Sequence, residues 1–261
     1  MSRRRSSGRR SERNGRPPNQ AADGDASQPP IVRRVASSFS IWPDVSWVSL
    51  KEQWPHLVVV FVALFSLYAY SAPRTVALED DGLFIMSSYF LGIDHPPGYP
   101  LHTLLGRLFT LLPVGSIAFR VHLLSAFLGA LTCVVMWLVV RSLLGNRVSA
   151  YTGALLYGLS ATFWSQSIIA ETYTLNTFFF FALVHLALGF LATKNLRLLY
   201  VLAGVFGLSL ANHWPLMLLS TPCLALLLVP ARREVLRTWP RMLGIAVIAC
   251  LLPYAWMVAR S

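Results

Sequence analysis

The sequence has few charged residues for its length and no paired cysteines. Of its 261 residues 13% are charged and 55% are hydrophobic, whereas about 25% of the residues of a soluble domain are charged. Cys133, Cys223 and Cys250 each lie in an apolar run, without CxxC or paired spacing, which disfavours a disulfide framework and a metal site. Strand-length alternation of apolar and polar residues is absent as well. An ordinary soluble domain is therefore excluded.

The positive charge is concentrated at the N-terminus. The formal net charge is +11, and nine arginines lie within the first 34 residues, so a nucleic-acid partner is not expected. Residues 1–50 are rich in Arg, Ser, Gly and Pro and have no apolar periodicity, which predicts a disordered cytoplasmic tail. A cleaved signal peptide is disfavoured because the first apolar run starts near Leu57. Residues 51–261 then form a polytopic membrane module.

Seven apolar stretches predict membrane helices. They are residues 57–72, 117–140, 148–164, 174–192, 198–212, 214–229 and 242–259. Several approach the ~17–25 residues that a membrane helix needs, and backbone groups in hydrocarbon must be hydrogen-bonded within their own segment. We therefore expect an all-α integral membrane protein, a bundle of about seven transmembrane helices.

The loops between these stretches differ in charge. Every second loop is basic, and basic residues concentrate in cytoplasmic loops, so the N-terminus is predicted to be cytoplasmic. The acidic residues of the membrane region gather on the other side, except Glu234; they are Glu79, Asp80, Asp81, Asp94 and Glu171. That outer side, periplasmic or lumenal, is where we expect the chemistry.

The first outer loop, residues 73–116, is longer than a simple connection requires and is therefore expected to carry substructure or function. Leucines at helical spacing predict an amphipathic helix over 101–112, either lying in the membrane interface or packed against the bundle. The preceding HPPGYP, His95 to Pro100, is stiff because its prolines fix φ, and it forms either part of a binding site or a structural turn.

Ionisable residues stand at three outer junctions. In the acidic triplet Glu79, Asp80 and Asp81, mutual repulsion raises the pKa of one member if the triplet is more than a solvated turn. Glu171 is a lone acid between apolar helices, which indicates a functional or paired residue. Its candidate partners are Arg120, His122, Asn212 and His213, whereas His185 lies in the middle of a stretch and is interpreted as a core residue.

Four segments resemble one family of multi-pass membrane proteins. The segments are DDGLFIMSSYFLGIDHPPGYPLHTLLGRLFTLLPVGSIAFRVHLLSAFLGAL, FWSQSIIAETYTLN, GLSLANH and LLPY. The family, long catalogued as a domain of unknown function, includes an animal endoplasmic-reticulum protein O-mannosyltransferase. The resemblance implies a GT-C-like module with interfacial helices in the first outer loop. Members of the family continue well beyond this length, so the chain resembles their N-terminal module.

The resemblance also implies a reaction. A sugar, expected to be mannose, moves from a polyprenyl-phosphate donor to a Ser or Thr hydroxyl of a protein acceptor, with Asp80 as catalytic base and no metal or other cofactor. Asp81, Glu79 and Glu171 are supporting acids. Residues expected to bind the donor phosphate or substrate are His95, Arg120, Arg107, Arg74, Tyr99, Tyr173, Asn176, Asn212 and His213.

One position departs from the family pattern, which resembles Asp-x-Gly-Glu. Asp80 and Gly82 match it, but Leu83 occupies the Glu position, so the chain is altered or inactive unless Glu79 or Asp81 compensates from a neighbouring position. The alternatives are a non-catalytic fragment or scaffold and a lipid or solute transporter. The expected location is the endoplasmic reticulum membrane in a eukaryote or the cytoplasmic membrane in a bacterium, with membrane lipid as a partner.

Overall fold

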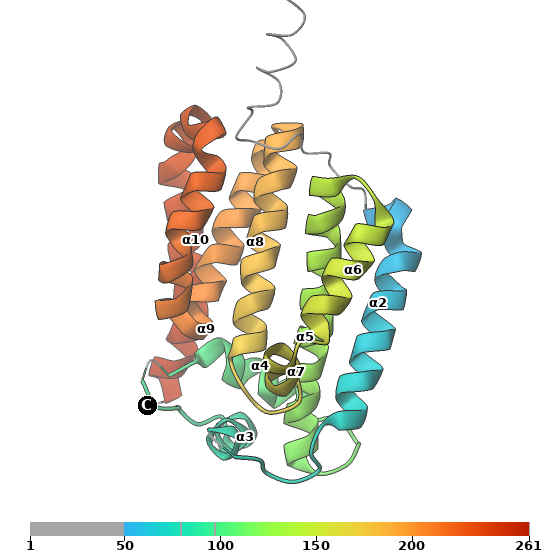
Figure 1. The fold of residues 1–261 in the computed structure, drawn as a ribbon. Coiled ribbons are helices and arrows are strands. Elements are labelled where there is room, and N and C mark those ends of the chain that lie inside the picture. Colours follow the sequence, from blue (N-terminus) through green and yellow to red (C-terminus); the bar gives the residue numbers. More distant parts are fainter. Residues whose placement is uncertain (1–49, 79, 97, 261) are drawn as a thin grey trace, which may run out of the picture. The chain divides into compact units, whose positions relative to one another are not determined.

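The structure of the chain, a computed structural model, describes residues 50–260 apart from Glu79 and Pro97 (Figure 1). The predicted tail over residues 1–50 and the acid Glu79 thus lie outside the described residues, save Leu50. Within them every regular element is a helix, which confirms the all-α prediction. The elements in chain order are α2 (Leu50–Ser71), α3 (Asp81–Phe90), α4 (Pro100–Thr110), α5 (Ile117–Leu144), α6 (Arg147–Gly158), α7 (Ala161–Ser167), α8 (Tyr173–Thr193), α9 (Leu196–Leu228), η2 (Val229–Ala231) and α10 (Arg232–Arg260).

Four segments are long and apolar enough to cross a membrane. They are Lys51–Ser71, Ile117–Leu144, Tyr173–Thr193 and Leu196–Arg260, the last of 65 residues. The predicted number of seven membrane helices is not confirmed by this criterion. Two of the predicted stretches, 198–212 and 214–229, fall within the single helix α9, and the stretch 148–164 is divided between α6 and α7.

The division of 148–164 follows from packing at Gly158. The hydroxyl of Tyr68 donates a hydrogen bond to the Gly158 carbonyl at 2.7 Å, and so satisfies a carbonyl that a continuing helix would have used. A Cβ at Gly158 would lie only 2.9 Å from Leu64 and 2.8 Å from Cys133. The close approach of α2 and α5 therefore ends α6 here, and α7 begins after Ser160 in extended conformation.

A break inside α9 lies at His213. Its φ of −130° and ψ of 79° are not helical, and Pro215 has no N–H to donate to the preceding turn. One cavity is lined by Leu202 and Phe206 from the first part of α9 and by Leu224 and Leu228 from the second part. A straight helix would separate Leu202 from Leu228 by about 39 Å at 1.5 Å per residue, so the two arms of α9 fold back on each other.

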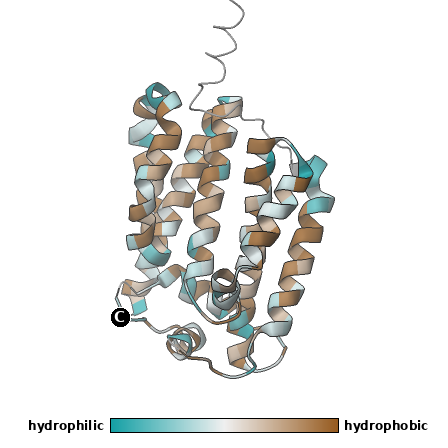
Figure 2. Cartoon of the chain, in the orientation of Figure 1, coloured by the Kyte–Doolittle hydropathy of each residue, from teal (hydrophilic) through white to brown (hydrophobic). Residues whose placement is uncertain are grey.

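α5 is the central helix of the bundle. One core cluster joins it to α2 and α6, and its largest buried side chains are Trp137 and Tyr68. A second cluster joins it to α8 and α9 through Leu128, Leu183 and Met217. Figure 2 shows hydrophobic residues along the middle of the long helices and hydrophilic residues near several of their ends. The apolar surfaces thus account for the packing of the bundle.

The short helices α3, α4 and α7 lie at one end of the long helices, opposite the α5–α6 connection (Figure 1). This is where the first outer loop was predicted to carry substructure. α4 corresponds to the amphipathic helix expected over 101–112, and its polar side faces the protein: His102, Thr103 and Thr110 are buried. Leu108 and Leu111 are exposed. An apolar face that points outward suits a helix at a membrane interface.

Candidate active site

Asp80 and His95 form a pair at the surface of the α3–α4 region. Asp80 caps the N-terminus of α3, and its Oδ2 lies 3.3 Å from Nε2 of His95. The other ring nitrogen of His95, Nδ1, lies 3.1 Å from the Pro96 carbonyl oxygen. That carbonyl, and then Asp80, raise the pKa of His95 above its usual value. A protonated His95 donates to both acceptors, and the other oxygen of Asp80 is accessible to solvent because its side chain is 58% exposed.

The HPPGYP segment holds Tyr99 in a left-handed conformation. Gly98 has φ of 95° and Tyr99 has φ of 44°, and Pro100 follows as the first residue of α4, where its missing N–H costs nothing. A tyrosine with positive φ is uncommon and persists only where its surroundings hold it. The segment therefore fixes the direction of the Tyr99 ring.

Four rings from three segments lie in sequence around Tyr99. Its ring centroid is 5.3 Å from that of His95 and 5.6 Å from that of His213, at the break in α9. The ring of His213 is in turn 6.1 Å from that of Tyr173, the first residue of α8. The three junctions singled out in the sequence thus meet at one place. We call His95, Tyr99, His213, Tyr173 and the carboxylate of Asp80 the Asp80 site.

Asp94 adds a second carboxylate beside this site. It is 5% exposed, its Oδ2 accepts a hydrogen bond from the Thr103 hydroxyl at 3.1 Å, and its Oδ1 is buried without a hydrogen-bond partner in the described residues. Burial raises the pKa of Asp94 to about 6, although the hydroxyls of Ser87 and Thr103 and the charge of His95 oppose the shift; the charge of Asp80 adds a smaller increase. An unsatisfied buried carboxylate oxygen is costly unless something donates to it.

Asp81, by contrast, is fully occupied by the protein. Its Oδ1 accepts from His122 Nε2 at 2.8 Å and from the Ala170 N–H at 2.6 Å, and its Oδ2 accepts from the Ala77 N–H at 2.7 Å. Burial opposes ionisation, but these hydrogen bonds outweigh it and the pKa of Asp81 lies below its usual value. The opposite nitrogen of His122 lies 2.9 Å from the Pro73 carbonyl oxygen. Asp81 therefore fastens the loop before α3 to α5 and to the α7–α8 connection.

Buried polar side chains lie close in sequence to Tyr173 and His213, two residues of the Asp80 site. Glu171 is buried in the α7–α8 connection, and the Asn212 amide donates to the Thr172 carbonyl at 3.0 Å. The amide oxygens of Asn176 and Asn212 are buried without a hydrogen-bond partner among the described residues. Burial raises the pKa of the Tyr99 hydroxyl, and the charges of Tyr173, Asp80, Glu171 and Asp94 raise it further. Acidic groups from three segments thus surround that hydroxyl.

The three predicted arginines make contacts apart from this ring cluster. The guanidinium of Arg74 lies 3.6 Å from the centroid of the Phe119 ring, and Arg107 donates to the Tyr89 carbonyl at 2.7 Å. Arg120 donates to three carbonyls at the end of α4 and in the turn after it, those of Val114, Thr110 and Gly115. These contacts stabilise the loop, and a role in phosphate binding stays a prediction.

Two buried polar residues were not among the predicted site residues. Asp94 was counted only as an outer acid, although its position directly before HPPGYP is a signal that could have identified it. His102 is fully buried against Phe84, with a centroid distance of 5.1 Å, and burial lowers its pKa to about 4. No sequence pattern distinguishes a buried neutral histidine on the polar face of a helix from an exposed one.

Comparisons with known proteins identify relatives of the part of the chain that contains these residues. Residues 80–237 match the family described as "Protein O-mannosyl-transferase TMEM260 N-terminal domain". The chain is 32% identical over 211 residues to protein O-mannosyl-transferase TMEM260 of Mus musculus, which covers 78% of this chain and 30% of the relative. It is 24% identical over 182 residues to protein O-mannosyl-transferase tmem260 of Dictyostelium discoideum, or 64% and 22% of the two chains. The chain thus spans less than a third of these relatives. No solved structure matches.

Proposed function

Because this chain belongs to the TMEM260 N-terminal domain family, we propose that it is the membrane-embedded part of a glycosyltransferase that transfers mannose from a polyprenyl phosphate to a Ser or Thr hydroxyl of a protein. The observation that carries the proposal is the meeting of three separate junctions at the Asp80 site, all of them inside the matched residues 80–237. An exposed carboxylate beside aromatic rings suits an exposed hydroxyl acceptor and a sugar.

We place the chain across the membrane seven times. The stretch Leu196–Arg260 is far too long for one crossing of a hydrocarbon layer about 30 Å thick, and α9 reverses at His213. Its two arms and α10 therefore make three crossings. α2, α5, α6 together with α7, and α8 supply four more, in a GT-C-like arrangement. The α3–α4 end lies on the lumenal or periplasmic side, and the N-terminus lies in the cytoplasm.

In the proposed reaction Asp80 acts as the general base. The free oxygen of its carboxylate removes the proton of the acceptor hydroxyl as the hydroxyl oxygen attacks the anomeric carbon of mannose. The bond between that carbon and the phosphate oxygen breaks, and the phosphate leaves with the electron pair. A single displacement without a covalent enzyme intermediate inverts the anomeric centre.

The neighbouring groups support this step. His95, whose pKa is raised above its usual value, lies 3.3 Å from Asp80 and, when protonated, places a positive charge near the departing phosphate. Tyr173, which is 43% exposed, presents a ring face that can bind the apolar face of a sugar, and the buried Tyr99 ring packs beside His213, whose ring also contacts that of Tyr173. The Oδ1 of Asp94, which has no hydrogen-bond partner among the described residues, can accept a hydrogen bond from a hydroxyl. Asp94 lies close to Ser87, which is one helical turn beyond Leu83 on α3. Asp94 is therefore a candidate replacement for the carboxylate missing at Leu83.

Transfer of radiolabelled mannose tests the function. Membranes that contain the chain receive polyprenyl-phosphate mannose and a Ser/Thr-containing peptide, and wild type is compared with Asp80→Asn. Loss of a general base is expected to lower the rate about 10²- to 10⁴-fold. The matched control is Glu234→Gln, which removes an acid at the other end of the helices and should leave transfer unchanged.

The possible outcomes separate the candidate functions. Equal transfer by wild type and Asp80→Asn contradicts Asp80 as base. If neither transfers mannose although the protein is inserted, the chain is a binding module that needs the remainder of the relatives' length, of which it spans 30% and 22%. Transfer of the intact lipid without cleavage of the sugar phosphate would instead indicate a transporter.

A further inference from the structure

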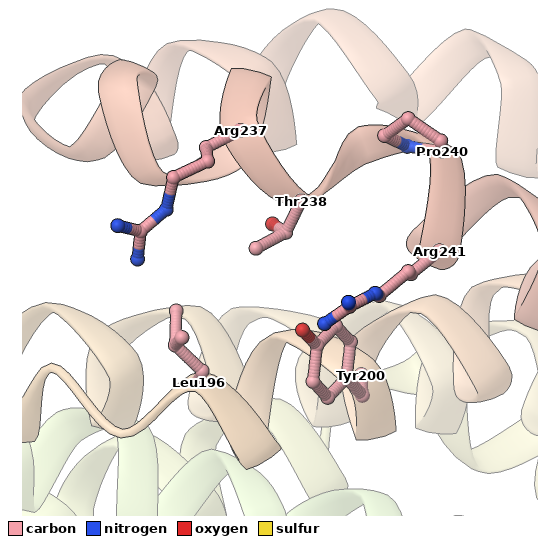
Figure 3. Close-up of a pocket in the computed structure, with 6 residues that line it drawn as sticks. All are labelled: Leu196, Tyr200, Arg237, Thr238, Pro240 and Arg241. Carbon is pink, nitrogen blue, oxygen red and sulfur yellow. The ribbon is translucent and has the colours of Figure 1, made fainter.

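A cavity with two arginines in its lining lies at the end of the helices opposite the Asp80 site. It measures about 360 Å³ and lies between the start of α9 and the first turns of α10. Its lining residues are Leu196, Tyr200, Arg237, Thr238, Pro240 and Arg241. Figure 3 shows the side chains of Arg237 and Arg241 extending from α10 toward Leu196 and Tyr200 on α9. The two guanidinium groups therefore both lie in the space between α9 and α10.

The cavity is rich in hydrogen-bond donors, and none of its described lining residues is acidic. Each guanidinium carries five N–H donors, and neither Arg237 nor Arg241 forms a hydrogen bond or ion pair within the described part of the chain. Tyr200 adds a hydroxyl. The Thr238 hydroxyl donates to the Glu234 carbonyl at 2.8 Å, so its hydrogen is already used within α10. Each planar guanidinium group can donate two parallel N–H hydrogen bonds to the oxygens of a phosphate.

The surroundings place the cavity at the membrane surface. Leu236, Trp239 and Leu243, on the same helix as the arginines, are exposed and apolar. Tryptophan beside arginine is typical of the level at which hydrocarbon gives way to lipid headgroups. Other basic residues occupy this end as well, namely Arg141, Arg147, Lys194, Arg197, Arg232 and Arg233. A ligand entering from the bilayer would meet the two arginines first.

We propose that this cavity binds the phosphate of an anionic glycerophospholipid, with Arg237 and Arg241 holding its oxygens and Tyr200 donating to them. Basic pockets between membrane helices at this level bind acidic headgroups. The site is separate from the Asp80 site and does not depend on the proposed transferase activity. An acidic lipid bound there joins α9 to α10, whose close packing is visible at Gly207, where a Cβ would overlap the backbone of Ala246.

Binding of phosphatidic acid to the purified full chain tests the proposal. The chain in neutral detergent is titrated with phosphatidic acid or phosphatidylcholine, and bound lipid is counted by native mass spectrometry. Arg237→Gln with Arg241→Gln is expected to weaken phosphatidic acid binding about 30-fold, from the loss of two arginines near the headgroup. Tyr200→Phe keeps the ring and serves as the milder variant, with an expected loss of about threefold.

The matched control is Arg147→Gln with Arg233→Gln, which removes the same charge from the same end outside the cavity. It should weaken binding no more than about threefold. Equal weakening by both double variants would show that the attraction is a general surface effect and would overturn the proposal. Inorganic phosphate distinguishes the sources of the ligand: if it displaces phosphatidic acid at equal concentration, the site takes free phosphate and the assignment to a lipid is wrong.

Discussion

At the scale of single residues, Asp81 and Asp94 show how the same side chain takes different roles. Both are buried in the first outer loop, Asp81 directly after Asp80 and Asp94 after the end of α3. Asp81 accepts hydrogen bonds from His122 and two backbone N–H groups, and its pKa lies below the usual value. Asp94 receives the Thr103 hydroxyl but keeps one oxygen unpartnered among the described residues, and its pKa rises to about 6. Asp81 is therefore structural, whereas Asp94 is available for a ligand.

Replacement of Asp94 by Asn is expected to stabilise the chain above pH 6. Burial disfavours the ionised carboxylate in the folded state. The pKa of Asp94 is therefore about 6 in the folded chain, compared with an ordinary value of 3.8. Wild type thus loses stability as the pH rises from about 4 to 6, by up to about 3 kcal/mol, and Asp94→Asn does not. Below pH 4 the carboxyl is neutral in both states and the difference vanishes. Unfolding free energies in mixed micelles between pH 4 and 8 measure this.

Thr103→Val is the control for that measurement. The variant keeps the carboxyl and removes the hydroxyl that lowers its pKa, so the loss of stability should begin at a pH similar to wild type but extend to higher pH. A difference between Asp94→Asn and wild type that stays constant from pH 4 to 8 would contradict the assignment. If Asp94 also binds a substrate hydroxyl, Asp94→Asn is more stable but transfers less mannose.

At the scale of secondary-structure elements, Asp81 connects three of them. It begins α3, pairs with His122 on α5 and accepts the N–H of Ala170 in the connection between α7 and α8. The two ring nitrogens of His122 both face acceptors, so only a ring with a hydrogen on each nitrogen satisfies them. These hydrogen bonds hold the start of α3, and with it Asp80 one residue earlier, in a fixed position relative to Tyr173, the first residue of α8.

Asp81→Asn is expected to loosen this connection. An asparagine amide group would oppose an N–H donor and leave His122 without its carboxylate, and the loss of one member of a buried pair costs about 3–5 kcal/mol. Thermal unfolding measures the loss, and hydrogen exchange at the Ala77 and Ala170 amides should accelerate. Asp80→Asn, which changes the exposed neighbour, should leave both amides as protected as in wild type. Unchanged protection in Asp81→Asn would contradict the role given to Asp81.

The sequence predicts the helices better than their boundaries. Proline, glycine and leucine spacing around Pro100 and Leu111 locates α4, and the apolar runs locate α2, α5 and α8. The fusion of two stretches in α9 and the division at Gly158 depend on contacts between distant segments. A proline indicates a bend at His213, but only packing decides whether the arms separate into two elements or fold back as one broken helix.

The candidate site was predictable where the topology alone determines it. Tyr173 and His213 stand at junctions on the same side as His95, so their meeting follows from the alternation of loops. The partners of Arg74 and Arg120 do not, because a long guanidinium side chain takes whichever ring or carbonyl the local turn presents. The burial of Asp94 likewise depends on how the loop folds over Thr103.

At the scale of the whole membrane module, charge separates by end. Most of its arginines, including Arg237 and Arg241, lie at the end where α8 meets α9, and the described acids apart from Glu52 and Glu234 lie at the α3–α4 end. Because basic residues prefer the cytoplasmic side, the difference favours the orientation proposed above. The proposed phosphate-binding cavity and the proposed sugar-transfer site lie at opposite ends of the bundle, so each can be tested without the other.

Labelling of single cysteines tests the seven crossings and their orientation together. In a chain whose Cys133, Cys223 and Cys250 are replaced by Ala, Thr75→Cys and Trp214→Cys should react with a membrane-impermeant maleimide from the lumenal or periplasmic side. Lys194→Cys and Arg233→Cys should react only after the membrane is permeabilised. Both pairs are needed. Thr75 and Lys194 report the orientation of the bundle, whereas Trp214 and Arg233 report whether α9 reverses direction within the membrane.

The position of Trp214 decides between the topologies. It follows the break at His213, and its side chain is 44% exposed, so a reversal of α9 at that level brings it to the surface next to the Asp80 site. A chain in which α9 crosses only once would hold Trp214 in the hydrocarbon, protected from both sides, and would place Arg233 beside Thr75. Protection of Trp214→Cys combined with labelling of Arg233→Cys in intact membranes would therefore overturn the seven-crossing arrangement, and reversed labelling of all four would overturn the orientation alone.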